Sequence, residues 1–167
     1  MRKFTQSLAL AALLLSTSAY AQNVAPAATV AAKAAKVPWL YEGSDVPVDD
    51  SWTFGVLPNG LRYAVKKNDV PAGQVSIRVR IDAGALHENN DEQGFAHLIE
   101  HLSFRGSTFV PDGEAKRIWQ RFGVTFGSDS NAQTTPTQTV YKLDLPSATE
   151  SGLDESLKIL AGMMEKP

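Results

Sequence analysis

The sequence contains no cysteine and only three histidines among its 167 residues. Without thiols the chain can form no disulfide bond, and any metal site has to be built from histidine and carboxylate side chains. A basic excess is also absent, because 16 lysines and arginines stand against 18 aspartates and glutamates. We therefore expect no nucleic-acid partner. With 43% hydrophobic and 20% charged residues, the chain can bury a core, which favours one globular unit.

Long hydrophobic runs are absent too, although a short one lies near the N-terminus. Two basic residues precede an apolar stretch from Leu8 to Leu15, and Ala19-Tyr20-Ala21 has the small-x-small pattern of a cleavage site. The stretch is too short to span a bilayer, so a retained membrane anchor is the weaker alternative. The pattern predicts a secretory signal peptide over residues 1–21, cleaved after Ala21, and a periplasmic or secreted mature protein without a stable membrane anchor.

The segment that follows the predicted cleavage site is rich in alanine, valine and proline. Residues 22–38 contain no aromatic side chain that would anchor them to a core. This composition predicts a flexible tether, with an isolated Ala-rich helix as the alternative. We expect residues 39–167 to form the folded region.

Four stretches of the folded region carry strand patterns. Apolar residues from Val75 to Ile81 alternate with polar ones, which predicts a strand with one buried face that includes Ile81. Pro58-Asn59-Gly60 is a turn signal between two shorter strands. The predicted strands are residues 52–57, 61–66, 75–81 and 138–145.

Three helices are predicted between and after the later strands. The first runs from about Phe95 to Phe104 and is ended by Gly106 in a C-terminal cap position. The second begins with Asp112 as its cap and ends at Gly123, and the third covers about 149–164. Antiparallel strands with helices grouped between them indicate an α+β fold, an antiparallel sheet with helices packed on one face.

Two of the three histidines lie in the stretch "HLIEH", as His97 and His101. Helical i, i+4 spacing projects them from one face, so they can bind a common ion, and Glu100 stands on the same side to take a proton from a water on that ion. Chance would give this pattern at a rate on the order of 0.2% in such a chain. The alternative is that both histidines are partly exposed and Glu100 is their salt partner. A separate apolar stripe on the helix disfavours that alternative. The stripe consists of Phe95, Leu98, Ile99 and Leu102.

Three runs, taken in order, resemble the N-terminal part of the pitrilysin/insulinase family of zinc metallopeptidases. They are "LPNGLRYAV", "IDAGALHENNDEQGFAHLIEHLSFRGS" and "FGSDSNAQTTPTQTVYKLDLP", and the resemblance covers about 59–145. It implies that His97 and His101 are zinc ligands and that Glu100 is the general base. It also implies that Asn131 and Ala132 lie on an edge strand alongside the substrate backbone, whereas the residues alone favour the alternative of an ordinary polar turn.

The resemblance further implies a third zinc ligand, a glutamate roughly 75 residues after the second histidine, to complete three protein ligands plus water. Glu150, Glu155 and Glu165 follow His101 by only 49, 54 and 64 residues. We therefore expect the chain to be an incomplete first domain of a pitrilysin-like metallopeptidase, truncated before that ligand and inactive or weakly active alone. Its expected partners are a peptide or unfolded protein substrate and the remainder of the peptidase, as a second homologous domain or a partner subunit.

The function that this resemblance implies is zinc-dependent endopeptidase activity, the hydrolysis of peptides or unfolded segments by a zinc-activated water. The alternative is a catalytically incompetent homologue that acts as a binding or partner subunit. Outside the motif, we expect His87 to be a surface residue, and Glu88 to be a solvated loop carboxylate or a local helix cap. Trp119 and Phe122 are expected in the core.

Overall fold

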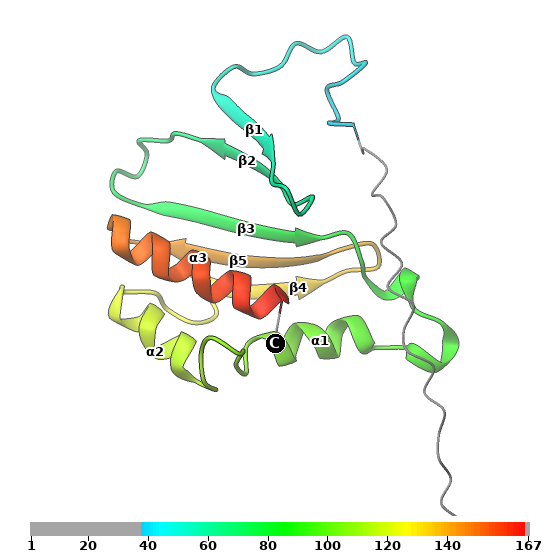
Figure 1. The fold of residues 1–167 in the computed structure, drawn as a ribbon, viewed down its shortest axis with the longest axis vertical. Coiled ribbons are helices and arrows are strands. Elements are labelled where there is room, and N and C mark those ends of the chain that lie inside the picture. Colours follow the sequence, from blue (N-terminus) through cyan, green and yellow to red (C-terminus); the bar gives the residue numbers. More distant parts are fainter. Residues whose placement is uncertain (1–37, 166–167) are drawn as a thin grey trace, which may run out of the picture. The chain divides into compact units, whose positions relative to one another are not determined.

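A computed structural model describes residues 38–165 of the protein (Figure 1). The predicted signal peptide over residues 1–21 and all but the last residue of the predicted tether lie outside the described residues. The described residues divide into two compact units. One comprises residues 38–50 and 55–63, and the other comprises residues 51–54 and 64–165.

The first two strands form a sheet of their own. β1 (Trp52–Val56) pairs with β2 (Arg62–Lys66), which confirms the two short predicted strands to within one residue at each end. The predicted turn between them is present, because Gly60 N donates to Leu57 O at 2.9 Å. Gly60 has a φ of 89°, a left-handed conformation that glycine adopts without steric cost.

A three-stranded antiparallel sheet is the centre of the larger unit. Its order is β3 (Val75–Ile81), β5 (Thr139–Leu145), β4 (Ser130–Thr134), so β5 is the middle strand. The odd-numbered residues of β5 are buried and the even-numbered ones are not, as expected when one sheet face meets a core. Ile81 departs from the prediction, because its side chain is 40% exposed where β3 ends.

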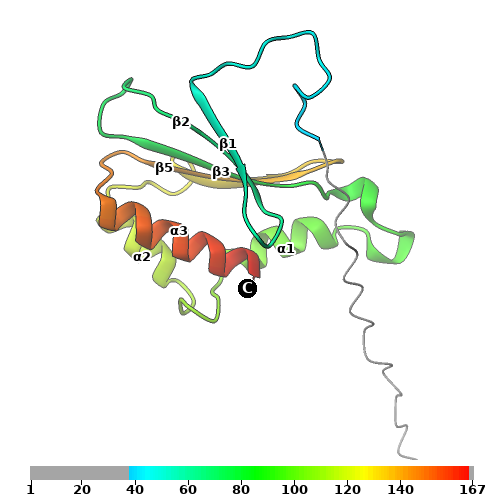
Figure 2. The ribbon, with the colours of Figure 1, turned by 45° about the horizontal axis from the view of Figure 1, so that its top comes forward.

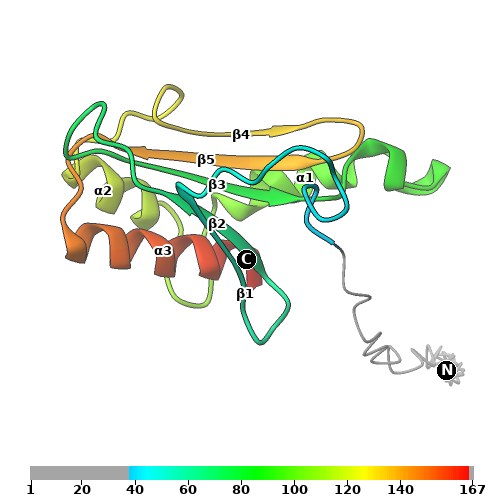
Figure 3. The same cartoon turned by 90° about the horizontal axis from the view of Figure 1, so that it is seen from above.

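Within residues 38–165, three α-helices accompany this sheet, together with two short 3₁₀ turns, Ala85–His87 and Asn90–Glu92. The helices are α1 (Phe95–Ser103), α2 (Glu114–Arg121) and α3 (Glu150–Glu165), and Figures 2 and 3 show them on one side of the sheet. None of the described helices is long and apolar enough to cross a membrane. The predicted α+β architecture, with helices on one sheet face, is confirmed.

The core lies between α2, α3 and β5. Trp119 is 1% exposed and Ile118 is also buried, and Phe122 packs against the same cluster, so the predicted core role of this helix is confirmed. The cluster of buried apolar side chains comprises Ala115, Ile118, Trp119, Val124, Tyr141, Leu143, Leu145, Ile159, Leu160 and Met163.

Two predicted helix caps are wrong. α1 ends within one residue of its predicted end, where Phe104 N donates to His101 O and Leu102 O, but Gly106 is not in the left-handed region and does not cap it. Gly106 is instead a point of close approach, since a Cβ there would lie 3.0 Å from Asp112 N. Asp112 does not cap α2, which begins after Gly113 without any side-chain cap, and its carboxylate lies 3.8 Å from the Arg105 guanidinium.

Candidate active site

His97 and His101 project from the same side of α1, as their spacing predicts. Their Nε2 atoms lie 3.1 Å apart and their ring centroids 4.6 Å apart. Two imidazoles on one tetrahedral ion, each with a metal–nitrogen bond of about 2.0–2.1 Å, would hold these nitrogens about 3.3 Å apart. The pair therefore fits a shared zinc-sized ion with a shift of a few tenths of an ångström. Both side chains are exposed, so further coordination positions are open to water or substrate.

A third protein ligand does not join this pair inside the larger unit. Among residues 38–165, no group of three or more histidine, aspartate and glutamate side chains is placed to hold one metal ion. The third histidine, His87, is exposed as predicted, and its Nδ1 accepts a hydrogen bond from Gly84 N at 3.2 Å.

Glu100 is buried, with only 6% of its surface exposed. Its Oε2 accepts a hydrogen bond of 2.7 Å from the Thr134 hydroxyl on β4. No hydrogen bond or ion pair joins Glu100 to either histidine within the described part of the chain. A buried carboxylate held by one neutral donor is an unusual arrangement for a merely structural residue, because burial of a charge is costly unless it is well paired.

The predicted apolar stripe of α1 has the opposite environment to Glu100. Its four side chains are between 50% and 55% exposed, so the stripe does not face the core of this unit. The helix instead turns Glu100 and Ser103 toward the sheet, where Ser103 Oγ lies 3.1 Å from the Tyr141 hydroxyl. The exposed residues are Phe95, Leu98, Ile99 and Leu102.

Glu88 determines where α1 begins. Its Oε2 accepts a hydrogen bond from Gly94 N and its Oε1 accepts one from Ala96 N, both at 2.7 Å. These backbone donors, Ala96 first, hold the pKa of the Glu88 carboxyl below its usual range. The local-cap interpretation of Glu88 is confirmed, and the cap lies only a few residues before the two histidines.

β4 is an edge strand, and it runs beside α1. The residue pairs Asp129–Asp144 and Thr135–Gln138 flank the β4–β5 ladder, and each is joined by a backbone N–H···O bond of 2.8 Å. Hydrogen-bonded pairs alternate along an antiparallel ladder, so odd-numbered residues of β4 direct their backbone groups toward β5. The backbone groups of Ala132 and Thr134 therefore point toward the open edge, where the described residues place no partner strand.

Asn131 and Ala132 both lie within this edge strand, as the family resemblance predicted, and the alternative of a polar turn is wrong. The Asn131 amide makes two local bonds. Its Oδ1 accepts from Ala132 N at 2.9 Å, and its Nδ2 donates to Gly127 O at 3.3 Å. The open-edge N–H of Ala132 is thus covered by its neighbour's side chain. Their role in substrate binding stays a prediction.

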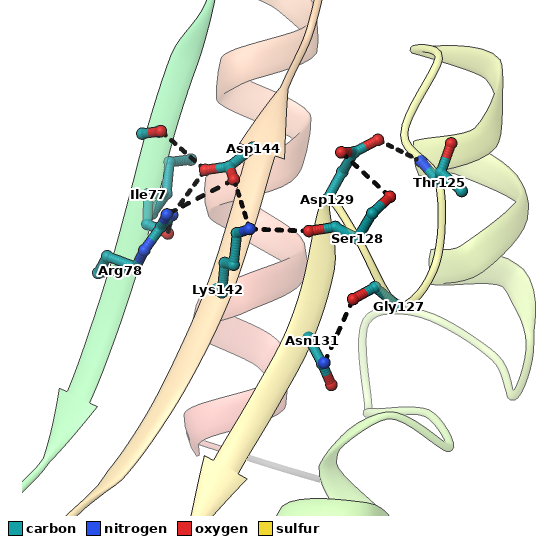
Figure 4. A network of polar contacts seen from close by, with 10 residues as sticks. Ile77, Arg78, Thr125, Gly127, Ser128, Asp129, Asn131, Lys142 and Asp144 are labelled. Atoms are coloured by element: carbon teal, nitrogen blue, oxygen red, sulfur yellow. Dashed lines mark hydrogen bonds and ion pairs between the residues drawn. The ribbon is translucent and has the colours of Figure 1, made fainter.

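A polar network on the sheet face away from the helices holds β4 in register (Figure 4). Asp144 accepts hydrogen bonds from Ser76 Oγ and Arg78 Nη1, both at 2.7 Å, and Lys142 Nζ lies 2.9 Å from it. Lys142 Nζ also donates to Ser128 O at 2.7 Å, just before β4. Burial alone would raise the pKa of Asp144, but the bonds from Arg78, Ser76 and Lys142 outweigh it and lower the pKa to about 2.

Thr134 is the residue of this site that the sequence analysis missed. It lies in a Thr-rich segment in which no single threonine stands out, and 34 residues separate it from Glu100. Only the alternation of side chains along a strand could have pointed to Thr134. Once β4 is recognised as a strand, residues 132 and 134 are predicted to lie on the same sheet face.

Comparison with known proteins decides the family. Residues 63–167 match the family model described as insulinase, peptidase family M16. The chain belongs to this insulinase family.

Two curated relatives of this M16 chain are named "Probable zinc protease PqqL". The protein of Haemophilus influenzae is 37% identical over 121 residues, which are 72% of this chain and 13% of the relative. The protein of Escherichia coli is 34% identical over 116 residues, which are 70% of this chain and 12% of the relative. The chain thus spans a small part of the length of these relatives.

Two solved structures agree with the fold described above. The first half of the periplasmic protease PqqL from Escherichia coli superimposes with a TM-score of 0.69 at 32% identity, over 72% of this chain and 26% of that one. Pitrilysin shares the fold with a TM-score of 0.57 at 23% identity.

Proposed function

We propose that this chain carries the metal-binding and proton-accepting part of a zinc-dependent endopeptidase. The observation that carries the proposal is the 3.1 Å separation of the two imidazole Nε2 atoms, on a helix whose buried Glu100 is held against an edge strand. Membership of the M16 family supports it, as do the names of the PqqL relatives, which call them probable zinc proteases.

His97 and His101 are the residues of this chain that would hold the zinc ion. When bound, zinc supplies Lewis acidity, which polarises a peptide carbonyl and makes a water molecule more acidic. Glu100 accepts a proton from the attacking water as the water oxygen bonds to the carbonyl carbon. The same carboxyl then gives that proton to the leaving amine when the C–N bond breaks. Its burial keeps competing bulk water away from this exchange.

The open edge of β4 suggests how a substrate is aligned. An extended peptide can add to the edge through the backbone groups of Ala132 and Thr134, after Asn131 releases the Ala132 N–H. This mode selects substrates that can become extended, which are peptides and unfolded protein segments. It reads backbone rather than side chains, so it imposes little sequence specificity by itself.

Further zinc ligands in this proposal come from outside residues 38–165. Two imidazoles supply no negative charge, whereas catalytic zinc sites have three protein ligands and an open position. The remainder of the peptidase, as a later part of the same protein or as a partner subunit, is the source that we propose.

Metal removal tests the proposed function. Treatment of the native protein with a chelator should abolish hydrolysis of an unstructured fluorogenic peptide, and one equivalent of zinc should restore it, because Glu100 alone cannot activate water strongly enough. Metal analysis must accompany each rate measurement. Full activity in protein shown to be metal-free would contradict the proposal. A zinc-loaded native protein that cleaves no peptide would instead support the role of a non-catalytic partner subunit.

We also propose that the protein is exported to the periplasm, as one solved relative is described. Cleavage after Ala21 would give a mature protein that begins at Gln22. Intact-mass measurement of material from the periplasmic fraction should find this terminus. A protein that retains Met1 and stays in the cytoplasmic fraction would rule out export.

A further inference from the structure

The contact between Thr134 and Glu100 joins the open strand edge to the proton acceptor. Within residues 38–165, the Thr134 hydroxyl is the one hydrogen-bond partner of the Glu100 carboxylate. The Thr134 hydroxyl is the donor in this bond of 2.7 Å, and Glu100 Oε2 is the acceptor. One carboxylate oxygen, Oε2, is therefore occupied, while Oε1 has no partner in this part of the chain.

A neighbouring threonine lies close to this contact without competing for it. The Thr139 hydroxyl lies 3.0 Å from Ala83 O, so its proton goes to that carbonyl, and its oxygen is 3.5 Å from Thr134 Oγ1. Glu100 Oε2, at 2.7 Å, is much nearer to Thr134 Oγ1 and receives its single proton. Thr134 is also β-branched within a strand, which restricts its χ1 rotation and keeps the hydroxyl in place.

The backbone of Thr134 faces the open strand edge, whereas its side chain faces Glu100. Its backbone N–H and C=O point toward the open edge, as the alternation of the β4–β5 ladder requires. Its side chain meets Glu100, which is buried between α1 and the sheet. A substrate strand that pairs with this edge would therefore contact the backbone of Thr134, and the side chain of the same residue orients the Glu100 carboxylate.

We propose that Thr134 is a positioning residue that holds Glu100 Oε2 and leaves Oε1 as the oxygen that exchanges the proton. The inference rests on the proposed function and assigns a role to a residue outside the "HLIEH" stretch. Hydrogen-bond partners of catalytic and ligating groups typically contribute 10- to 100-fold to activity, because they remove orientations in which the group cannot react.

Two substitutions at Thr134 separate the hydroxyl from the methyl group. Thr134→Val keeps the shape and removes the donor, and Thr134→Ser keeps the donor and removes the methyl. In the native zinc-loaded protein, Thr134→Val should lower kcat by roughly tenfold or more and change KM by less than about twofold. Thr134→Ser should restore most of kcat. Zinc content should equal that of the wild type in both variants, because neither substitution touches a ligand.

The matched control is Thr139→Val. Thr139 lies on the same β4–β5 hairpin as Thr134, and the substitution removes its hydroxyl, which is bound to Ala83 O. It should leave kcat within about twofold of the wild type, because its proton does not reach Glu100. A crystal structure of Thr134→Val adds a readout independent of turnover. It should show the Glu100 carboxylate rotated or in more than one conformer. If Thr134→Val does not fold, Thr134→Ala takes its place in both measurements, with the same expected results.

Several outcomes would overturn the inference. Unchanged kcat in Thr134→Val, or a failure of Thr134→Ser to restore it, would show that the hydroxyl does not position the base. A rise in KM with kcat unchanged would assign Thr134 to substrate binding alone. A wild-type protein without zinc-dependent hydrolysis overturns the proposed function and this inference together. An active wild type with an equally active Thr134→Val overturns only the inference.

Discussion

Replacement of Glu100 by glutamine is expected to leave zinc bound while it lowers kcat by at least about 100-fold, the low end for loss of a positioned general base. An amide has nearly the same size as the carboxylate, but it cannot accept a proton from water. The amide oxygen can still accept the hydrogen bond that Thr134 now donates to Oε2. The buried position is therefore still filled and still hydrogen-bonded in the variant. A fall in kcat then reports the loss of the proton acceptor and not a change in packing.

The measurement is metal content and peptide hydrolysis on the native protein and its Glu100→Gln variant. Glu114→Gln serves as the matched control, since Glu114 lies on α2 and pairs with Arg117 at 3.3 Å. Wild-type turnover in Glu100→Gln would show that another group accepts the proton. Loss of zinc together with activity would make Glu100 a ligand, or the residue that orients one.

The regular parts of the fold could be predicted from local patterns. β3 and β5 alternate apolar and polar residues with a period of two, and such a period has one structural solution when one face meets a core. Trp119 could be placed in the core because a large aromatic residue on a short amphipathic helix has few other environments. These inferences need only neighbours in the sequence.

The capping residues of the helices were harder to predict, because several residues compete for the same role. Asp112 has the side chain of a good cap, yet it lies near Arg105, and Gly113 in a left-handed conformation directly precedes α2. Glu88 caps α1 from six residues before Gly94, and the sequence alone left its role open between such a cap and a solvated loop carboxylate. Which of these residues caps a helix depends on the path of the loop that precedes the helix.

The environment of Glu100 could not be predicted from α1 alone. The exposed apolar stripe and the buried glutamate reverse the usual order of an amphipathic helix, and the position of β4 accounts for the burial of Glu100. Thr134 reaches Glu100 because β4 turns back along β5, which brings together residues 34 positions apart. Departures from local rules of this kind are expected at functional sites, where the arrangement serves chemistry at some cost in stability.

Removal of either imidazole should have a different consequence from Glu100→Gln, because zinc itself is lost. Loss of a hydrogen-bond partner behind a metal ligand typically costs 10- to 100-fold in affinity, so loss of the ligand itself in His97→Ala or His101→Ala should cost more than about 100-fold. Activity should fall with metal content in both variants. The double variant should bind no more zinc and be no more active than either single one, because it lacks both imidazole ligands that this chain supplies.

His87→Ala is the matched control for these two variants, because His87 is the third histidine of the chain and lies exposed before α1. It should keep one equivalent of zinc and wild-type turnover. Metal analysis after gel filtration and zinc titration of metal-free protein give the comparison. Full zinc content in His97→Ala or His101→Ala would show that the ion is held elsewhere, and the 3.1 Å approach of the two Nε2 atoms would then be only a side-chain hydrogen bond on a helix surface.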